Sequence, residues 1–285
     1  MKFTPASFRA WQHKRITLLG MSGVGKTHLA TLLRREDWFH YSGDYRIGTR
    51  YLNEHILDQI KQQAMQVPFL RDLLRRDWIH IRNNIRVDDL GPVLSFVGKL
   101  GDPERGGVEL TPFRQRQALY RQAEILAMHD VPSCIDKARD IYGYTHFVND
   151  AGGSLCDLDS AGVIEQLAQH SLILYIKVTD AQEEQTLIQR AQQAPKPLYY
   201  RPEFLDAQLA RYLSENQLDY AAQMDPDAFT RWIFPHLFHA RAPRYDAIVK
   251  PHGYTVTSQA LATVRDEHDF LALLTAAITN HPKEA

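Results

Sequence analysis

The chain has 285 residues and a mass of 32.8 kDa, which suits one large domain or two small ones. Hydrophobic residues make up 44 % and charged residues 24 %, an ordinary balance that excludes a disordered chain, a collagen-like chain and a disulfide scaffold. Lys and Arg total 33 against 34 for Asp and Glu, so the net charge of −1 gives no global reason to expect binding to nucleic acid or to an anionic membrane. The two cysteines, Cys134 and Cys156, form no motif and indicate reduced thiols. With no secretory signal and no long apolar segment in the sequence, we expect a cytoplasmic protein.

The first predicted elements are a short buried strand at 16–19 and a helix that begins near Lys26, joined by a glycine-rich loop. The segment GMSGVGKT fits the pattern G-x-x-x-x-G-K-[ST] between a strand and a helix, which is the context that a phosphate-binding loop requires. Glycines let backbone N–H groups turn toward phosphate oxygens, and the new helix presents its positive end to the same anion. The predicted nucleotide-binding residues of this segment are Gly20, Met21, Ser22, Gly23, Val24, Gly25, Lys26, Thr27 and His28.

Two side chains of the loop have predicted chemical roles. Lys26 is expected to reach the β- and γ-phosphates of a nucleoside triphosphate and to act in catalysis. The hydroxyl of Thr27 is expected to bind Mg²⁺. ATP and Mg²⁺ are therefore the predicted cofactors.

A second buried strand is predicted at 38–41, and Asp44 follows it in a glycine-containing turn. Ligands of open α/β sheets lie beyond the carboxyl ends of the strands, which places Asp44 near the phosphate site. Its carboxylate can accept a proton from a substrate hydroxyl or help to hold Mg²⁺, while Arg46 and Arg50 can clamp an anionic acceptor. The same letters also suit an ordinary surface turn, so both interpretations remain open.

The following segment, 49–144, reads as a helical insert. Helices are predicted from about 52, from Pro68 and from about 112 with Thr111 as its N-cap, while 78–87 alternates like a strand and Gly91-Pro92 breaks a short helix. An insert of this length is expected to cover the acceptor site and exclude water.

The third and fourth strands are predicted within 145–154 and 171–180. The third would end at Asp150, a candidate ligand for the water shell of the metal, and Gly152 and Gly153 would let the backbone approach a substrate closely. After the fourth strand, Arg190 and Arg201 are candidates to contact the triphosphate as a lid closes, with Arg190 also proposed as catalytic; the alternative is that they are surface charges.

Taken together, these segments resemble the shikimate kinase and gluconate kinase group of nucleoside-monophosphate-kinase-like P-loop kinases. The resemblance is carried by GMSGVGKT, by SGDYR after the second strand, and by 145–154, 171–180 and 241–257 in the expected order. It implies phosphoryl transfer from ATP to a hydroxyl group. The long insert and an enlarged lid depart from the group, so neither shikimate nor gluconate carries over as the acceptor. SGDYR also resembles the Ser-x-Asp-x-Arg turn of polynucleotide and tRNA kinases.

We therefore expect an α/β fold with a five-stranded parallel sheet of P-loop NTPase type, helices on both faces and a large helical insert. The predicted organisation is a nucleotide-binding core at 1–48 and 145–285, with a lid within about 190–240, and an insert at 49–144. The expected partners are ATP and a small molecule with a hydroxyl acceptor. The alternatives are an ATP-driven regulatory switch and a polynucleotide or tRNA kinase. The sequence leaves the oligomeric state open.

Overall fold

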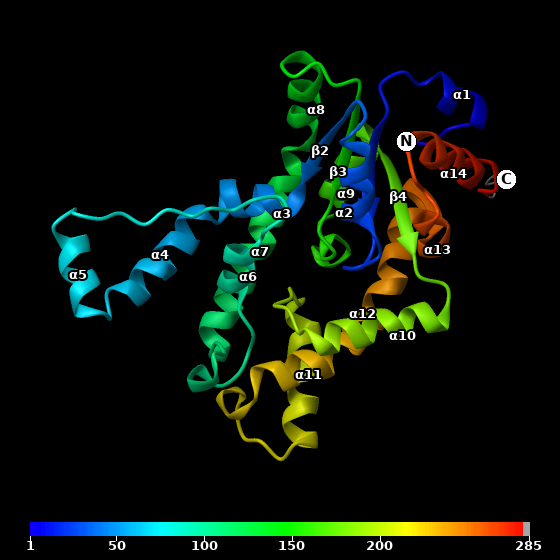
Figure 1. Cartoon of the computed structure of the whole chain (residues 1–285). Coiled ribbons are helices and arrows are strands. Elements are labelled where there is room, and N and C mark those ends of the chain that lie inside the picture. The colour runs from blue at the N-terminus through cyan, green and yellow to red at the C-terminus, as the bar shows by residue number, and fades with distance from the viewer. Residues whose placement is uncertain (282–285) are drawn as a thin grey trace. The chain divides into compact units, whose positions relative to one another are not determined.

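The computed structural model of the chain describes residues 1–281, which divide into two compact units (Figure 1). The core unit comprises Met1–Gly43, Ile125–Pro195 and the chain from Arg231 on. The second unit comprises Asp44–Glu124 and Lys196–Thr230. Each unit is thus built from segments that are distant in the sequence.

A five-stranded, entirely parallel sheet forms the centre of the core unit. Its strands are β1 (Arg15–Leu19), β2 (Trp38–Ser42), β3 (His146–Asp150), β4 (Leu172–Lys177) and β5 (Gly253–Thr257). They lie in the order β2-β3-β1-β4-β5. The predicted α/β fold class is confirmed. Because β1 and β3 are neighbours, the loops that follow these two strands leave the same edge of the sheet side by side.

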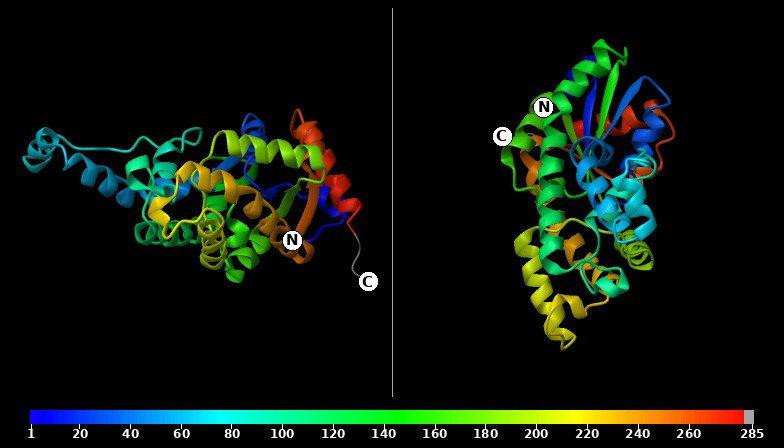
Figure 2. Two further views of the ribbon diagram at one scale, coloured as in Figure 1. Left: turned by 90° about the horizontal axis from the view of Figure 1, so that it is seen from below. Right: turned by 90° about the vertical axis from the view of Figure 1, so that its left-hand side faces the viewer.

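Helices cover both faces of this sheet, as right-handed crossovers between parallel strands require (Figure 2). Helices α8 and α9 pack together on one face, and α2 lies on the other. Trp38, Phe147 and Tyr254 are among the largest side chains that the sheet buries completely. The helices that lie wholly in the core unit are α1 (Pro5–Ala10), α2 (Lys26–Leu33), α8 (Val131–Asp140), α9 (Ala161–His170), α10 (Ala181–Gln193), α13 (Ser258–Ala262) and α14 (Glu267–Thr279).

The second unit is helical. It contains the turn of π-helix Ile47–Tyr51 and the helices α4 (Asn53–Ala64), α5 (Pro68–Arg75), α6 (Gly91–Val97) and α11 (Pro202–Glu215). Two long helices, α7 (Leu110–His129) and α12 (Pro226–His252), contribute residues to both units. Polar contacts within the second unit join its two segments: the amide of Gln117 on α7 donates to the carbonyl of Leu198 and accepts from the N–H of Tyr200.

Several local predictions are wrong in the structure. Residues 78–87 form no strand and contain only an isolated bridge between Arg86 and Asp89, because an apolar alternation without a neighbouring strand has nothing to pair with. Pro92 starts α6 instead of breaking a helix, since the first turn of a helix needs no proline N–H. Helix α7 begins at Leu110, so Thr111 lies inside it and is not its N-cap.

The segment after β2 is also helical where a turn was predicted. The four residues Gly43–Arg46 form α3, and the chain continues directly into the π-helical turn. Within residues 1–281, no helix is both long and apolar enough to cross a membrane.

Candidate functional site

The glycine loop, residues 20–25, joins the end of β1 to the start of α2 in the core unit. Gly23 and Gly25 have φ angles of +92° and +100°, a backbone conformation that side chains with a Cβ rarely adopt. A Cβ on Gly20 would lie 2.8 Å from the carbonyl oxygen of Ile176 on β4. The three glycines of the loop are therefore required by the course of the backbone.

The start of α2 has the character of an anion site. Gly25 caps the helix and makes no side-chain hydrogen bond, so the cap residue does not occupy the amides of the first turn. These amides and the helix dipole favour a negative charge at this end. The buried ammonium group of Lys26 lies under the glycine loop and donates to the carbonyl oxygens of Gly20 at 2.6 Å and Met21 at 3.0 Å. The loop thus brings backbone N–H groups and a fixed cation to one place.

Asp150, at the carboxyl end of β3, lies beside the same helix start. Its Oδ2 accepts a 2.7 Å hydrogen bond from the hydroxyl of Thr27. The sheet register explains this contact, because Asp150 pairs with Leu18 of β1 on one side and with Ser42 of β2 on the other. The structure therefore brings together Thr27 and Asp150, two of the three residues predicted to hold the metal.

These donors fit a magnesium ion bound together with phosphate. Mg²⁺ keeps several waters and takes one or two protein ligands plus phosphate oxygens, in contrast to a cation held in an all-protein cage. A threonine hydroxyl hydrogen-bonded to a single carboxylate is such a donor set. Residues 1–281 contain no group of three or more His, Cys, Asp or Glu side chains that could hold a metal ion.

A cavity of about 420 Å³ lies in the core unit beside the glycine loop. Its walls combine the loop and α2 with side chains of α10 and α13, and much of the lining is apolar, with Leu29, Leu187 and Leu261. Five residues predicted from the sequence to bind nucleotide line this cavity. They are Gly23, Val24, Gly25 and His28 of the loop and α2, and Arg190 after β4. Arg190 lies in the last turn of α10 (Ala181–Gln193).

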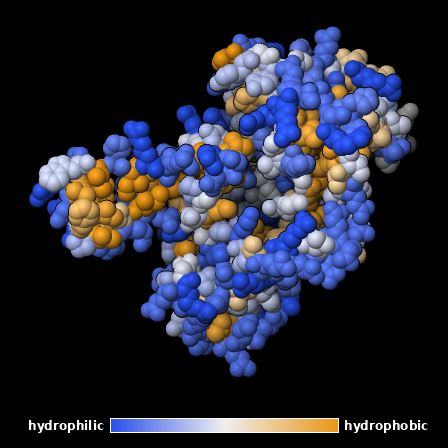
Figure 3. Space-filling model, in the orientation of Figure 1, coloured by the Kyte–Doolittle hydropathy of each residue, from blue (hydrophilic) through white to orange (hydrophobic). Residues whose placement is uncertain are grey.

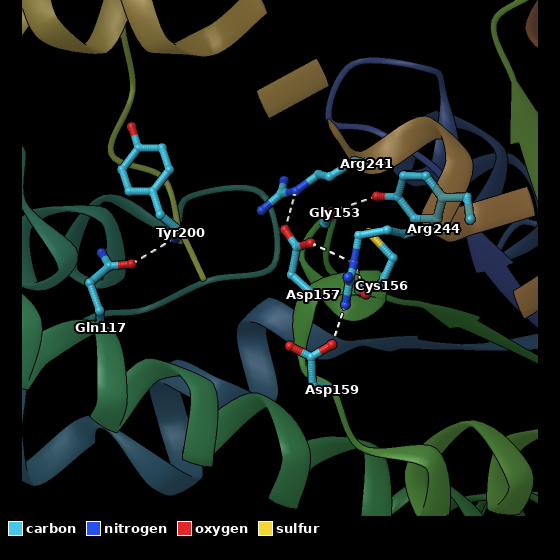
Figure 4. Close-up of polar contacts among 9 residues, drawn as sticks. Gln117, Gly153, Cys156, Asp157, Asp159, Tyr200, Arg241 and Arg244 are labelled. Atoms are coloured by element: carbon cyan, nitrogen blue, oxygen red, sulfur yellow. Dashed lines mark hydrogen bonds and ion pairs between the residues drawn. The ribbon is translucent and has the colours of Figure 1, made fainter. Parts of the chain in front are cut away.

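The loop after β3 is tied to α12 (Figure 4). The hydroxyl of Tyr245 on α12 donates to the carbonyl oxygen of Gly153 at 2.5 Å, and its ring stacks on Tyr175 of β4. A Cβ on Gly153 would lie 3.2 Å from the backbone nitrogen of Ser22, so this loop packs directly on the glycine loop. Gly152, the residue before, is buried. Helix α12 therefore supports the backbone behind the glycine loop.

A buried charge cluster strengthens that attachment. Arg241 donates from Nε to Asp157 at 2.6 Å, and Nε of Arg244 lies 3.1 Å from the other oxygen of the same carboxylate. Arg244 also pairs with Asp159. Burial acts to lower the pKa of Arg241, but the surrounding groups, with the Asp157 carboxylate foremost, together raise it. The guanidinium group stays charged, as a buried partner of Asp157 must.

The remaining predicted site residues belong to the second unit, where the structure gives only their local surroundings. Asp44 is half-buried at the start of α3, and the hydroxyl of Tyr120 on α7 donates to its Oδ1 at 3.2 Å. Arg46 is half-buried at the end of α3, and Arg50 is exposed. Arg201 precedes α11 as its N-cap residue. Their roles in binding substrate or phosphate stay predictions.

Sequence reasoning missed His40 and Tyr245. The side chain of His40 on β2 is 2 % exposed, and its Nε2 lies 3.7 Å from Asp150 Oδ2 with no hydrogen-bond partner among residues 1–281. A polar residue inside a predicted buried strand was the available signal for His40. No local signal marked Tyr245, because its role depends on a contact with a residue 92 positions away. His236 and His239 lie on α12 against Trp232 and Glu184 respectively.

Comparisons with known proteins assign the chain to no family. No protein-family model and no curated protein matches the chain. Among solved structures, the chain is similar to the crystal structure of a shikimate kinase from Bacteroides thetaiotaomicron, with 15 % identity, a TM-score of 0.36, and coverage of 93 % of this chain and 94 % of that chain. Identity and TM-score this low carry no functional inference, so the geometry of the core unit has to supply it.

Proposed function

We propose that this protein binds ATP with Mg²⁺ and transfers the γ-phosphoryl group to a hydroxyl of a small molecule. The observation that carries the proposal is the cavity beside the glycine loop, with Lys26 and the Thr27–Asp150 pair at the same end of the sheet. A fixed cation, the amides at a helix start, a hydroxyl–carboxylate pair suited to a metal and an adjoining apolar cavity are the parts that a nucleoside triphosphate needs.

The nucleotide would lie along the line from the cavity to the loop. The nucleoside would occupy the apolar cavity, whose volume is within the usual range for small-molecule sites. Arg190, exposed on α10 at the cavity wall, would lie against the base or the phosphates. The phosphates would lie on the amides of the glycine loop and the first turn of α2.

The chain's own residues would then stabilise charge on the transferring group. Lys26 would exchange its two carbonyl partners for phosphate oxygens, and Thr27 and Asp150 would hold Mg²⁺. Bound Mg²⁺ supplies neutralisation of the charge that develops on the phosphates. Asp44 would accept the proton of the acceptor hydroxyl, with Arg46, Arg50, Gly152 and Gly153 around the acceptor. We further propose that the insert at 49–144 covers that acceptor and that the segment with Arg201 closes over the triphosphate.

The test has two stages. Isothermal titration calorimetry should show Mg²⁺-dependent ATP binding to the wild-type chain and an affinity about 10- to 100-fold lower for Lys26→Ala. The protein is then incubated with terminally ¹⁸O-labelled ATP and pooled polyols, sugar acids and other hydroxylated metabolites, and products are identified by mass spectrometry. A labelled phosphomonoester formed by the wild type and absent with Lys26→Ala supports the proposal. ATP binding without any phosphorylated product in the pool would favour the regulatory switch, and absence of ATP binding would contradict both.

A further inference from the structure

One segment of the second unit exposes apolar side chains that the proposed reaction does not use. This segment, residues 67–82, is called the arm here and contains α5 with the chain on either side of it. Val67, Phe69 and Trp78 are 46 %, 70 % and 66 % exposed. Figure 3 shows the hydrophobic side chains gathered at the end of the second unit where α4 and α5 lie. Exposed large apolar groups clustered in this way mark an interaction site.

Helix α5 is amphipathic and packs only slightly on the rest of the described chain. One face of α5 is apolar and carries Phe69, Leu70, Leu73 and Leu74, since residues four apart lie above one another on a helix. The opposite face carries Arg71 and Arg75. No residue of α5 is buried, and the helix packs extensively on no other element of the described chain. A helix of eight residues is not stable alone in water, so its apolar face requires a partner.

The charge of the arm identifies the chemistry of that partner. Four arginines, at 71, 75, 76 and 82, stand against two aspartates, at 72 and 77, so the arm is cationic in a chain whose net charge is −1. The guanidinium of Arg76 lies over the ring of Trp78, 4.9 Å from its centroid. A second copy of the arm would bring like charges together, whereas an anionic surface would be attracted.

We propose that the arm docks on the surface of an anionic lipid bilayer. The exposed apolar residues lie before, within and after α5 and not on one rigid face. Such a spread set of side chains can insert into a lipid surface, because a lipid surface adapts to their positions. Apolar and aromatic residues on one face and arginines on the other are the composition of helices that lie in the membrane interface. The arginines reach the anionic headgroups while Phe69 and Trp78 enter the boundary with the acyl chains. This inference is independent of the proposed reaction.

The experiment measures co-flotation of the full-length protein with vesicles. Vesicles of phosphatidylcholine containing 30 % phosphatidylglycerol are compared with vesicles of phosphatidylcholine alone. The wild type is expected to bind the anionic vesicles and to be released by high salt. Phe69→Ser with Trp78→Ser should lower the partition coefficient by about tenfold or more, and Arg71→Gln, Arg75→Gln or Arg76→Gln by about fivefold each.

The matched control is Ile141→Ser, which removes an apolar side chain of similar exposure, 68 %, from the core unit. It should bind vesicles like the wild type. Equal thermal melting of all variants shows that they are folded. Failure of the wild type to bind anionic vesicles, or binding that the arm variants leave unchanged, overturns the proposal. Sedimentation that shows a dimer lost in the Phe69 and Trp78 variant, with no vesicle binding, would assign the arm to a protein contact instead.

Discussion

The hydroxyl of Thr27 and the carboxylate of Asp150 are 2.7 Å apart, although 123 residues separate them in the chain. Thr27 lies in the opening turn of α2, and Asp150 is the last residue of β3. Parallel pairing of β1 with β3 produces the contact, because both strands end at the same edge of the sheet. The site therefore depends on sheet register as much as on the glycine loop.

Asp150→Asn is expected to weaken the contribution of Mg²⁺ to ATP binding by about 10- to 100-fold, as loss of a residue that orients a metal ligand typically does. The amide still accepts a hydrogen bond from Thr27 but carries no charge for the cation. Calorimetry with ATP in Mg²⁺ and in EDTA measures the difference. The control is Asp246→Asn, an aspartate paired with Lys177 outside the site. An Asp150→Asn protein that retains the full Mg²⁺ effect would remove Asp150 from the metal site.

Lys26→Ala is expected to lower the affinity for MgATP by about 10- to 100-fold, the usual worth of a hydrogen bond to a charged group. The fold should survive, because the hydrogen bonds of the ammonium described above go to carbonyl groups of the glycine loop and not to the sheet or its helices. Circular dichroism checks the fold and calorimetry the affinity. Lys177→Ala, at the end of β4 with a surface partner, serves as the control. Wild-type affinity in a folded Lys26→Ala protein would contradict nucleotide binding at this loop.

Arg190→Ala is expected to reduce nucleotide affinity or turnover while leaving the melting temperature of the unliganded protein unchanged. The side chain of Arg190 is exposed at the cavity wall, so truncating it leaves no void in the hydrophobic core and should not change the stability of the fold. Differential scanning fluorimetry with and without ATP gives both quantities. Arg211→Ala, which removes an exposed arginine of the second unit paired with Glu215, is the comparison. If both variants respond to ATP like the wild type, Arg190 is a surface charge.

The substitution Asp44→Asn is expected to distinguish a kinase from an ATP-driven regulatory switch. A general base contributes about 10² to 10⁴ in rate, so product formation should fall by that factor while ATP still binds. The assay is phosphorylated product by mass spectrometry, with an acceptor found in the metabolite screen. Tyr120→Phe, which removes the hydroxyl that donates to Asp44, should have a smaller effect in the same direction. Full activity of Asp44→Asn would exclude it as the base.

Cys156 is expected to resist alkylation in the folded protein. Burial raises the pKa of its thiol to about 12, so only about one molecule in 10⁴ carries the thiolate at pH 8. Cys134 is half-buried on α8 and should react first. Mass spectrometry after iodoacetamide treatment at pH 8 should find Cys134 modified and Cys156 intact, with both modified in guanidinium. Rapid native labelling of Cys156 would show that the loop after β3 opens.

The sequence predicted those parts of the fold that local patterns determine. Apolar runs and glycines located the first two strands and the glycine loop, because backbone conformation and phosphate binding limit the residues allowed there. The later strands were indicated by the resemblance of 145–154, 171–180 and 241–257 to P-loop kinases. Contacts between distant segments could not be predicted from the sequence. Tyr245 contacts Gly153 and His40 lies beside Asp150 because of tertiary packing, which the spacing of apolar residues along the chain does not specify. The alternation of apolar residues at 78–87 wrongly predicted a strand. Alternation shows which side chains would share a face of a strand, but not whether another strand is there to pair with it. The places of Asp44, Arg46, Arg50 and Arg201 around a substrate stay predictions.

The sheet order has a consequence for biosynthesis. Strand β4, which is buried from Leu172 to Ile176, has β1 on one side and β5 on the other. The chain makes β4 well before β5, since the last helix of the second unit and all of α12 come between them. During that interval the nascent chain carries an apolar strand with one unpaired edge, which is a template for aggregation. Chains that stop before Gly253 are therefore expected to associate with one another through the unpaired edge of β4.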